Sequence, residues 1–105
     1  MINGRSFSTT AEFCSIAKSN KRGLFIGEET GGGYYGNNSG SSTIITLPNS
    51  GIKIFIPTTK YIMAVNKTEF PDRGIFPDYE IIPAMDDILN NNDVQLNFAF
   101  KLARN

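Results

Sequence analysis

The N-terminal pattern of apolar and polar residues predicts a strand end, a turn and a helix. Met1-Ile2 is a short apolar run that ends at Asn3-Gly4, a dipeptide typical of turns. Thr9 and Glu12 have the spacing of a capping box, which indicates a helix over about residues 9–20. The apolar face of this helix consists of Phe13, Ile16 and Ala17.

Mostly β-structure is predicted downstream. Residues 24–26 favour a strand, and a loop rich in Gly, Asn and Ser follows over about residues 30–42. Residues 43–47 and 52–56 flank Pro48-Asn49-Ser50-Gly51, and these four residue types are favoured in turns. The two segments therefore predict a hairpin. The remaining expected elements are a strand at 61–65, a helical turn at Asp86-Asp87 and a last helix over 93–99.

Ser8 is the first candidate for chemistry, because it lies where the strand end turns into the helix. A hydroxyl at the start of a helix lies at the positive end of the dipole, where free N–H groups can stabilise an oxyanion. The alternative is that Ser6 and Ser8 are ordinary residues of a helix start, since Ser is favoured there for structural reasons. The residues around Ser8 leave both interpretations open.

Four blocks in order resemble the tail-specific, or C-terminal-processing, serine peptidases. The family has an Asn-Gly followed by Ser-x-Ser, a Gly-Glu-x-Thr-x-Gly strand and loop, a Gly-Ile-x-Pro-Asp stretch and a closing Asp-x-Gln-Leu helix. The similar segments here are residues 3–13, 23–33, 74–83 and 93–99. The resemblance implies a peptide or protein substrate, and a bacterial extracytoplasmic location.

Two features separate this chain from the family's processing branch. Gly33 occupies the position that matches the lysine general base, and the chain has no histidine. It is therefore more similar to the branch of tricorn protease and the retinoid-binding-protein repeats. The resemblance implies that Ser8 attacks the carbonyl and that the N–H of Thr9 holds the oxyanion. The base is then expected from upstream residues, so this chain alone should be nearly inactive.

The acidic partner of the nucleophile has two candidates, Glu69 and Asp72, which both precede Gly74. Glu69 has the matching chemistry, whereas Asp72 has the closer spacing and could instead pair with Arg73 or cap a turn. A solvated loop carboxylate is the alternative for Glu69.

The glycine-rich loop is expected to form a mobile wall of the substrate cleft. Its Gly31, Gly32 and Gly33 lack the lysine and serine of a phosphate-binding loop. Tyr34 and Tyr35 would supply apolar contacts to a substrate. A plain connecting loop is the alternative.

The expected fold is α/β: part of a crotonase-like βα spiral with a β-hairpin and a C-terminal helix. The chain of 105 residues is short for the family's catalytic domain, so we expect a single partial domain over residues 1–105, its C-terminal half. A half-domain would leave Phe13, Ile16 and the row Ile52-Ile54-Ile56 uncovered, which predicts self-association.

Composition narrows the function classes. Ten basic and ten acidic residues give a formal net charge of zero, which does not favour a nucleic-acid partner. No apolar run is long enough for a membrane span, and the residue types do not indicate a metal or cofactor site. Cys14 is expected to be a small buried thiol. A non-catalytic module that binds peptides or hydrophobic ligands on the same fold is the rival function.

Overall fold

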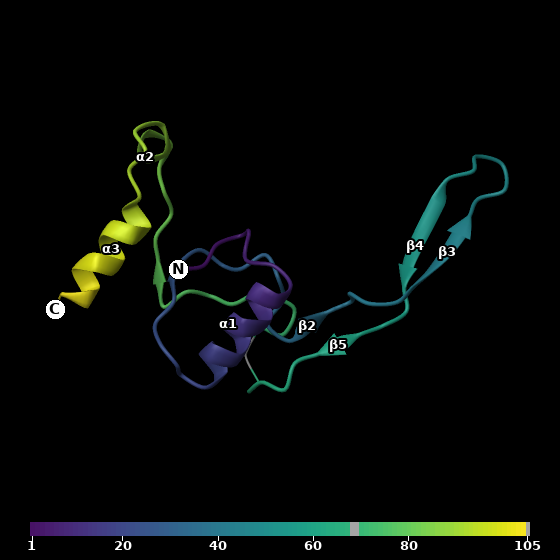
Figure 1. The fold of residues 1–105 in the computed structure, drawn as a ribbon, viewed down its shortest axis with the longest axis horizontal. Coiled ribbons are helices and arrows are strands. Elements are labelled where there is room, and N and C mark those ends of the chain that lie inside the picture. The colour runs from purple at the N-terminus through teal and green to yellow at the C-terminus, as the bar shows by residue number, and fades with distance from the viewer. Residues whose placement is uncertain (68–69, 105) are drawn as a thin grey trace.

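A computed structural model describes residues 1–67 and 70–104 and shows a mixed α/β chain (Figure 1). The described residues combine three helices with small two-stranded sheets, which agrees with the α/β class. In chain order the elements are α1 (Thr9–Ser19), β1 (Ile26–Gly27), β2 (Gly36–Asn37), β3 (Ser42–Thr46), β4 (Lys53–Pro57), β5 (Tyr61–Ile62), β6 (Tyr79–Glu80), α2 (Met85–Leu89) and α3 (Val94–Ala103).

The body of the molecule is a β-α-β unit. Ile2 forms a parallel bridge to Gly27 in β1. The chain therefore starts beside β1, continues through α1 and then forms β1 itself, which runs in the same direction as the segment at Ile2. The N–H of Ile2 donates to the carbonyl of Ile26, and the N–H of Glu28 donates to the carbonyl of Ile2, both at 2.9 Å. On its other side β1 pairs with β6, also in parallel. The strand expected at residues 24–26 therefore lies slightly later in the chain.

Helix α1 packs through its small side chains. Ala11, Cys14 and Ser15 are buried, whereas Phe13 and Ile16 are 72% and 51% exposed. Of the apolar face expected from the sequence, Ala17 packs against the core and Phe13 and Ile16 do not. A close approach to the glycine-rich loop explains this, because a Cβ on Gly32 would lie only 2.5 Å from that of Ala11. The core cluster consists of Ile2, Ala11, Cys14, Phe25, Tyr34 and Ile75.

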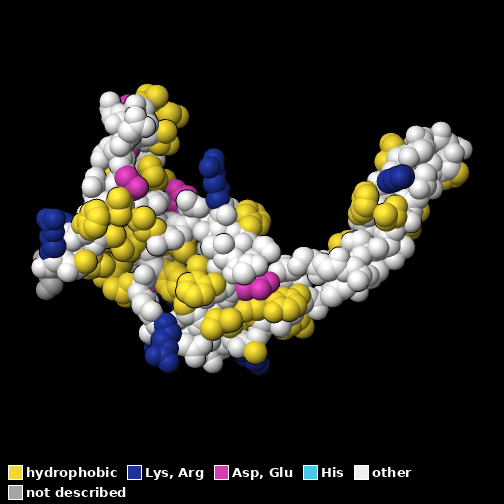
Figure 2. All heavy atoms as spheres, viewed as in Figure 1, with side chains coloured by type: hydrophobic (Ala, Val, Ile, Leu, Met, Phe, Trp, Pro, Cys, Tyr) yellow, Lys and Arg dark blue, Asp and Glu magenta, His cyan; other side chains and the backbone are white. Residues whose placement is uncertain are grey.

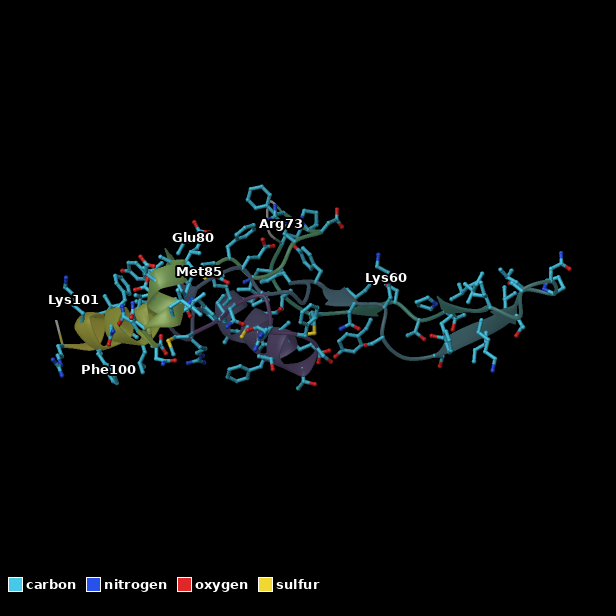
Figure 3. The ribbon with its side chains drawn as sticks, turned by 90° about the horizontal axis from the view of Figure 1, so that it is seen from above. Lys60, Arg73, Glu80, Met85, Phe100 and Lys101 are labelled. Atoms are coloured by element: carbon cyan, nitrogen blue, oxygen red, sulfur yellow. The ribbon has the colours of Figure 1, made fainter. Side chains whose placement is uncertain are left out.

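The hairpin of β3 and β4 is confirmed, and it projects from the body as an arm (Figure 1). Its register pairs Ile44 with Phe55 and Ile45 with Ile54. The pairing of β2 with β5 forms the neck between body and arm. Seen from above, Lys60 marks this neck, and Phe100 and Lys101 mark the opposite end of the molecule (Figure 3). Part of the expected loop at 30–42 is therefore strand, and the strand expected at 61–65 is shorter.

The two short helices at the C-terminus form a second projection. The expected helical turn at Asp86-Asp87 is confirmed as α2, and the expected last helix is confirmed as α3. Asp93 caps α3 by accepting from the N–H of Leu96 at 2.9 Å. The side chain of Gln95 donates to the carbonyl of Ile81 at 2.9 Å, which ties α3 to the end of β6.

The molecule is much more extended than a compact domain. Its radius of gyration is 17.9 Å and its extents are 61 × 36 × 20 Å. A compact chain of this length has a radius of gyration of about 13 Å. None of the helices in the described parts of the chain has the length and apolar character that a bilayer crossing requires.

Asp78 joins three segments of the body. Its carboxylate accepts from the N–H of Phe25 at 2.7 Å and forms an ion pair with Lys18 on α1. Partial burial raises the pKa of Asp78, but the hydrogen bonds from Lys18 and Phe25 outweigh this effect and hold the pKa below its ordinary value. The ionised form of Asp78 therefore stabilises the fold.

We expect Asp78→Ala to lower the free energy of unfolding by about 2 kcal/mol, because it leaves the Phe25 N–H without its charged acceptor. The contribution is complete above about pH 5 and is lost as the pH falls below the ordinary carboxyl pKa, since the unfolded chain then takes up protons first. Urea unfolding between pH 3 and pH 7 measures this. The control Lys18→Met removes the surface ion pair and the contact of the ammonium with the Phe25 ring, keeps the Phe25 N–H bonded to Asp78, and should cost less than about 1 kcal/mol. A variant Asp78→Ala with the wild-type pH dependence would contradict this account.

Candidate functional site

Ser8 lies at the N-cap of α1 in a strained backbone conformation, with φ 50° and ψ −127°. The expected position of Ser8 at the start of the helix is confirmed. A non-glycine residue at this φ costs of order 1–3 kcal/mol, and such residues gather at functional sites. A sharp, strained turn from strand to helix is also the geometry that exposes a nucleophilic serine in known hydrolases.

The two serines before α1 have different environments. Ser6 is buried, and its hydroxyl accepts from the N–H of Asn3 at 3.2 Å, which stabilises the turn at Asn3-Gly4. Ser8 is exposed, and within the described residues its hydroxyl has no hydrogen-bond partner. Ser6 therefore shapes the turn, and Ser8 is the serine available for chemistry.

The capping box predicted for Thr9 and Glu12 is wrong. Thr9 is the first helical residue, Ser8 is the N-cap, and the helix has no side-chain cap. Glu12 instead accepts from the side chain of Asn37 at 3.4 Å. Among the described residues the N–H of Thr9 has no backbone acceptor, because Arg5, the residue four positions earlier, lies in the preceding turn. This free N–H is the property that an oxyanion donor needs.

A small hollow of about 270 Å³ lies at Ser8. The glycine-rich loop forms one side of it, and the N–H of Gly32 donates to the carbonyl of Ser6 at 3.0 Å. Gly31, Gly32 and Gly33 thus lie beside Ser8, as expected from the sequence. The hollow is lined by Phe7, Ser8, Ala11, Glu12, Gly31, Gly32, Gly33, Asn37 and Ser39. Glu12, which sequence reasoning assigned only to a helix start, is the one titratable side chain among these lining residues.

Thr30 fixes the glycine-rich loop in place. Its side chain is buried, and its hydroxyl accepts from the N–H of Ile75 and donates to the carbonyl of Gly32, both at 2.8 Å. Glu29 accepts from the N–H of Gly74 at 2.8 Å and from the guanidinium of Arg73. The hydrogen bonds from Arg73 and Gly74 hold the pKa of Glu29 below its ordinary value. The loop is thus anchored to residues 73–75 rather than left free.

Tyr34 and Tyr35 do not line the hollow at Ser8. Tyr34 is a core residue with 7% of its surface exposed, and it packs edge-on against Tyr35 at a ring distance of 5.1 Å. The hydroxyl of Tyr35 donates to the carbonyl of Asn66 at 3.3 Å. The N–H of Tyr34 donates to the carbonyl of Arg73 at 3.0 Å, so Tyr34 is held in the body and does not line the site.

Of the two acidic candidates only Asp72 is described, and it does not line the hollow at Ser8. Glu69 lies outside the described residues. Asp72 is exposed and lines a different hollow, of about 680 Å³, together with Gly33 and Tyr35. Arg73 pairs with Glu29, so the expected alternative of an Asp72–Arg73 pair is wrong.

Comparisons with known protein families, curated proteins and solved structures found no match to this chain. Among the residues that the structure describes, no group of three or more His, Cys, Asp or Glu side chains could hold a metal ion. Cys14 is buried in the core as expected, and burial raises the pKa of its thiol, so it is a structural residue.

We expect Ser8→Gly to raise the free energy of unfolding by about 1 kcal/mol, because glycine adopts φ 50° without the strain of a Cβ. Ser8→Ala is the matched control, since it removes the same hydroxyl but keeps the Cβ and the strain. Urea unfolding of the three proteins measures the difference. Equal stabilities for the glycine and alanine variants would show that the turn at Ser8 is not strained.

Proposed function

We propose that Ser8 is the nucleophile of a serine peptidase domain related to the tail-specific peptidases. The observation that carries this proposal is the strained turn, which presents an exposed hydroxyl without a hydrogen-bond partner beside a free N–H at a helix start. A purely structural serine at an N-cap would use its hydroxyl to cap the helix. A strained backbone at a residue whose side chain does not cap the helix is typical of a functional residue.

The chemistry is acyl transfer to Ser8. The Ser8 oxygen bonds to the carbonyl carbon of a peptide, its proton passes to a base, and the carbonyl oxygen becomes an oxyanion held by the N–H of Thr9. Collapse of this intermediate breaks the C–N bond, and the amine leaves with a proton. Water then attacks the ester and restores the Ser8 hydroxyl. The helix dipole of α1 favours the oxyanion at the same place.

Among the described residues at the hollow, Glu12 is the one titratable side chain, and it accepts from Asn37 rather than from Ser8. The residues that line the hollow at Ser8 include no lysine, and the chain has no histidine. We propose that a residue outside these 105 positions acts as the base, and that the β-α-β unit of Ile2, α1 and β1 is one turn of a crotonase-like spiral. Glu69 would orient that base, because Asp72 lies at a different hollow.

A non-catalytic binding module is the second candidate function, and the missing base favours it. The apolar Phe7 and Ala11 beside the hollow suit a hydrophobic group of a ligand. In that case Ser8 would donate a hydrogen bond to the ligand and form no covalent bond.

The rate at which Ser8 is labelled in the presence of an external base distinguishes the two candidate functions. At pH 7 a fluorophosphonate probe should label the chain slowly, and about 0.1 M imidazole should accelerate the labelling of Ser8 by about tenfold, which is a part of the roughly 100-fold or more that a positioned base contributes. Mass spectrometry of peptides locates and quantifies the labelled serine. Ser8→Ala should abolish the accelerated labelling.

Ser39→Ala is the matched control, because Ser39 lines the same hollow but has an ordinary loop backbone. Its labelling at Ser8 should equal that of the wild type. If imidazole leaves Ser8 no more reactive than the other exposed serines, the peptidase proposal fails and the binding module is favoured.

A further inference from the structure

The hollow at Ser8 has an apolar side and a polar side. The apolar side is formed by the ring of Phe7 and the methyl group of Ala11, which both lie against the glycine-rich loop. A Cβ on Gly31 would lie 2.3 Å from the Phe7 ring, and a Cβ on Gly32 would lie 2.5 Å from that of Ala11. The loop and the start of α1 therefore enclose the apolar side closely.

Glu12 is the carboxylate on the polar side of the hollow. It lies one turn of α1 after Ser8, and its N–H donates to the carbonyl of Ser8 at 3.0 Å. Glu12 is half-buried, and its Oε1 accepts a long hydrogen bond of 3.4 Å from the side chain of Asn37. The Asn37 oxygen accepts from the N–H of Ser39 at 2.9 Å, so the amide nitrogen of Asn37 faces Glu12. The polar side thus combines a fixed amide with a carboxylate.

Within the described residues nothing neutralises the negative charge of Glu12. The ion pairs found there join Lys18 with Asp78 and Arg73 with Glu29. On the face shown in Figure 2, the Lys and Arg side chains stand singly at the edges of the body and on the arm. A carboxylate can accept about four hydrogen bonds, and the one hydrogen bond that Glu12 accepts from the described residues is the long one from Asn37. A charged donor from a ligand would therefore find a free acceptor in the hollow.

We propose that the hollow takes a lysine or arginine side chain of the substrate, with its stem against Phe7 and Ala11 and its cationic head at Glu12. This assignment rests on the function proposed for Ser8, and it names the substrate class as peptides with a basic residue beside the scissile bond. A basic side chain matches both sides of the hollow, because it buries an apolar stem and keeps a charged head. The volume of about 270 Å³ suits one side chain, since pockets for whole ligands hold about 300–1,000 Å³.

Other side chains match the hollow less well. A purely apolar residue would take water from the Glu12 carboxylate and return no hydrogen bond, which is unfavourable for a charged group. An acidic residue would be repelled by Glu12. The cation also assists the proposed acyl transfer, because the Glu12 carboxylate by itself repels the oxyanion that forms at Ser8, and a positive charge beside it offsets that repulsion.

Peptide binding tests the assignment without any chemistry at Ser8. The probes are acetyl-Ala-Lys-Ala-amide and acetyl-Ala-norleucine-Ala-amide, whose blocked ends leave the lysine head as the only charge. The 105-residue chain should bind the lysine peptide about fivefold more tightly, as an ion pair at a partly exposed site provides. About 0.5 M salt should remove most of this preference. NMR shifts of the amides of Gly31, Gly32 and Gly33 measure the affinity and locate the peptide at the hollow.

Glu12→Gln should bind the two peptides equally, because it keeps the shape of the side chain and removes its charge. Glu80→Gln is the matched control, since it removes the same charge from an exposed position on β6 and should keep the lysine preference. An acidic residue in the first turn also favours a helix through the dipole of α1. If that were the only role of Glu12, Glu12→Gln would change the urea stability and keep the lysine preference, which would overturn the proposal.

A third peptide distinguishes two sources of positive charge. If the norleucine peptide with a free N-terminus binds as tightly as the lysine peptide, the hollow takes a chain end and the proposal is overturned. Equal binding of the two blocked peptides to the wild-type chain would overturn it too, and a reactive Ser8 would then leave the peptidase proposal intact. A lysine preference with an unreactive Ser8 would support the assignment of the hollow and make the protein a binding module for basic ligands.

Discussion

The fold of the body depends on two backbone hydrogen bonds that hold Ile2 beside β1. Ile2 donates to Ile26 in β1 and accepts from Glu28, which follows β1 directly. These bonds fix the first residues beside β1, so the chain must turn sharply within a few residues to begin α1. Ser8, with its φ of 50°, lies in this short turn between Ile2 and α1. The position of the candidate nucleophile follows from strand pairing.

The loop beside Ser8 depends on contacts from far along the chain. Thr30 bonds to Ile75, and Glu29 bonds to Gly74 and Arg73, all more than forty residues later. These bonds hold the glycines close to Ala11, and the close contact selects the small face of α1 for the core. The shape of the hollow and the orientation of the helix therefore have one cause. Asp78 makes similar long-range contacts, because it accepts from the N–H of Phe25 and pairs with Lys18.

The body is well connected, whereas the arm and the C-terminal helices leave apolar surface in water. Phe55 on the arm is 63% exposed, and Leu89 on α2 is 71% exposed. Burial of such surface is the main favourable term in folding and association. In the proposed function the base comes from outside these residues, so the candidate site would be completed by further protein.

The sequence by itself determined the local structure. The turn chemistry of residues 48–51 and the apolar strands beside it specify the hairpin, Asp93 starts α3, and Asn3-Gly4 followed by helix formers places Ser8 at the start of α1. These features depend on neighbours in the chain, so their residue types are sufficient to predict them. The resemblance to a peptidase family rests on the same local motifs and stays a proposal.

Only the tertiary structure decided which surfaces meet. It placed Ala11 in the core instead of Phe13 and Ile16, and it put Tyr34 in the core instead of in the site. It paired Arg73 with Glu29 across 44 positions and kept Asp72 away from the hollow at Ser8. Sequence could not settle these points, because an apolar side chain signals burial or a partner surface equally well, and a charged side chain has many partners within reach until the fold fixes the distances.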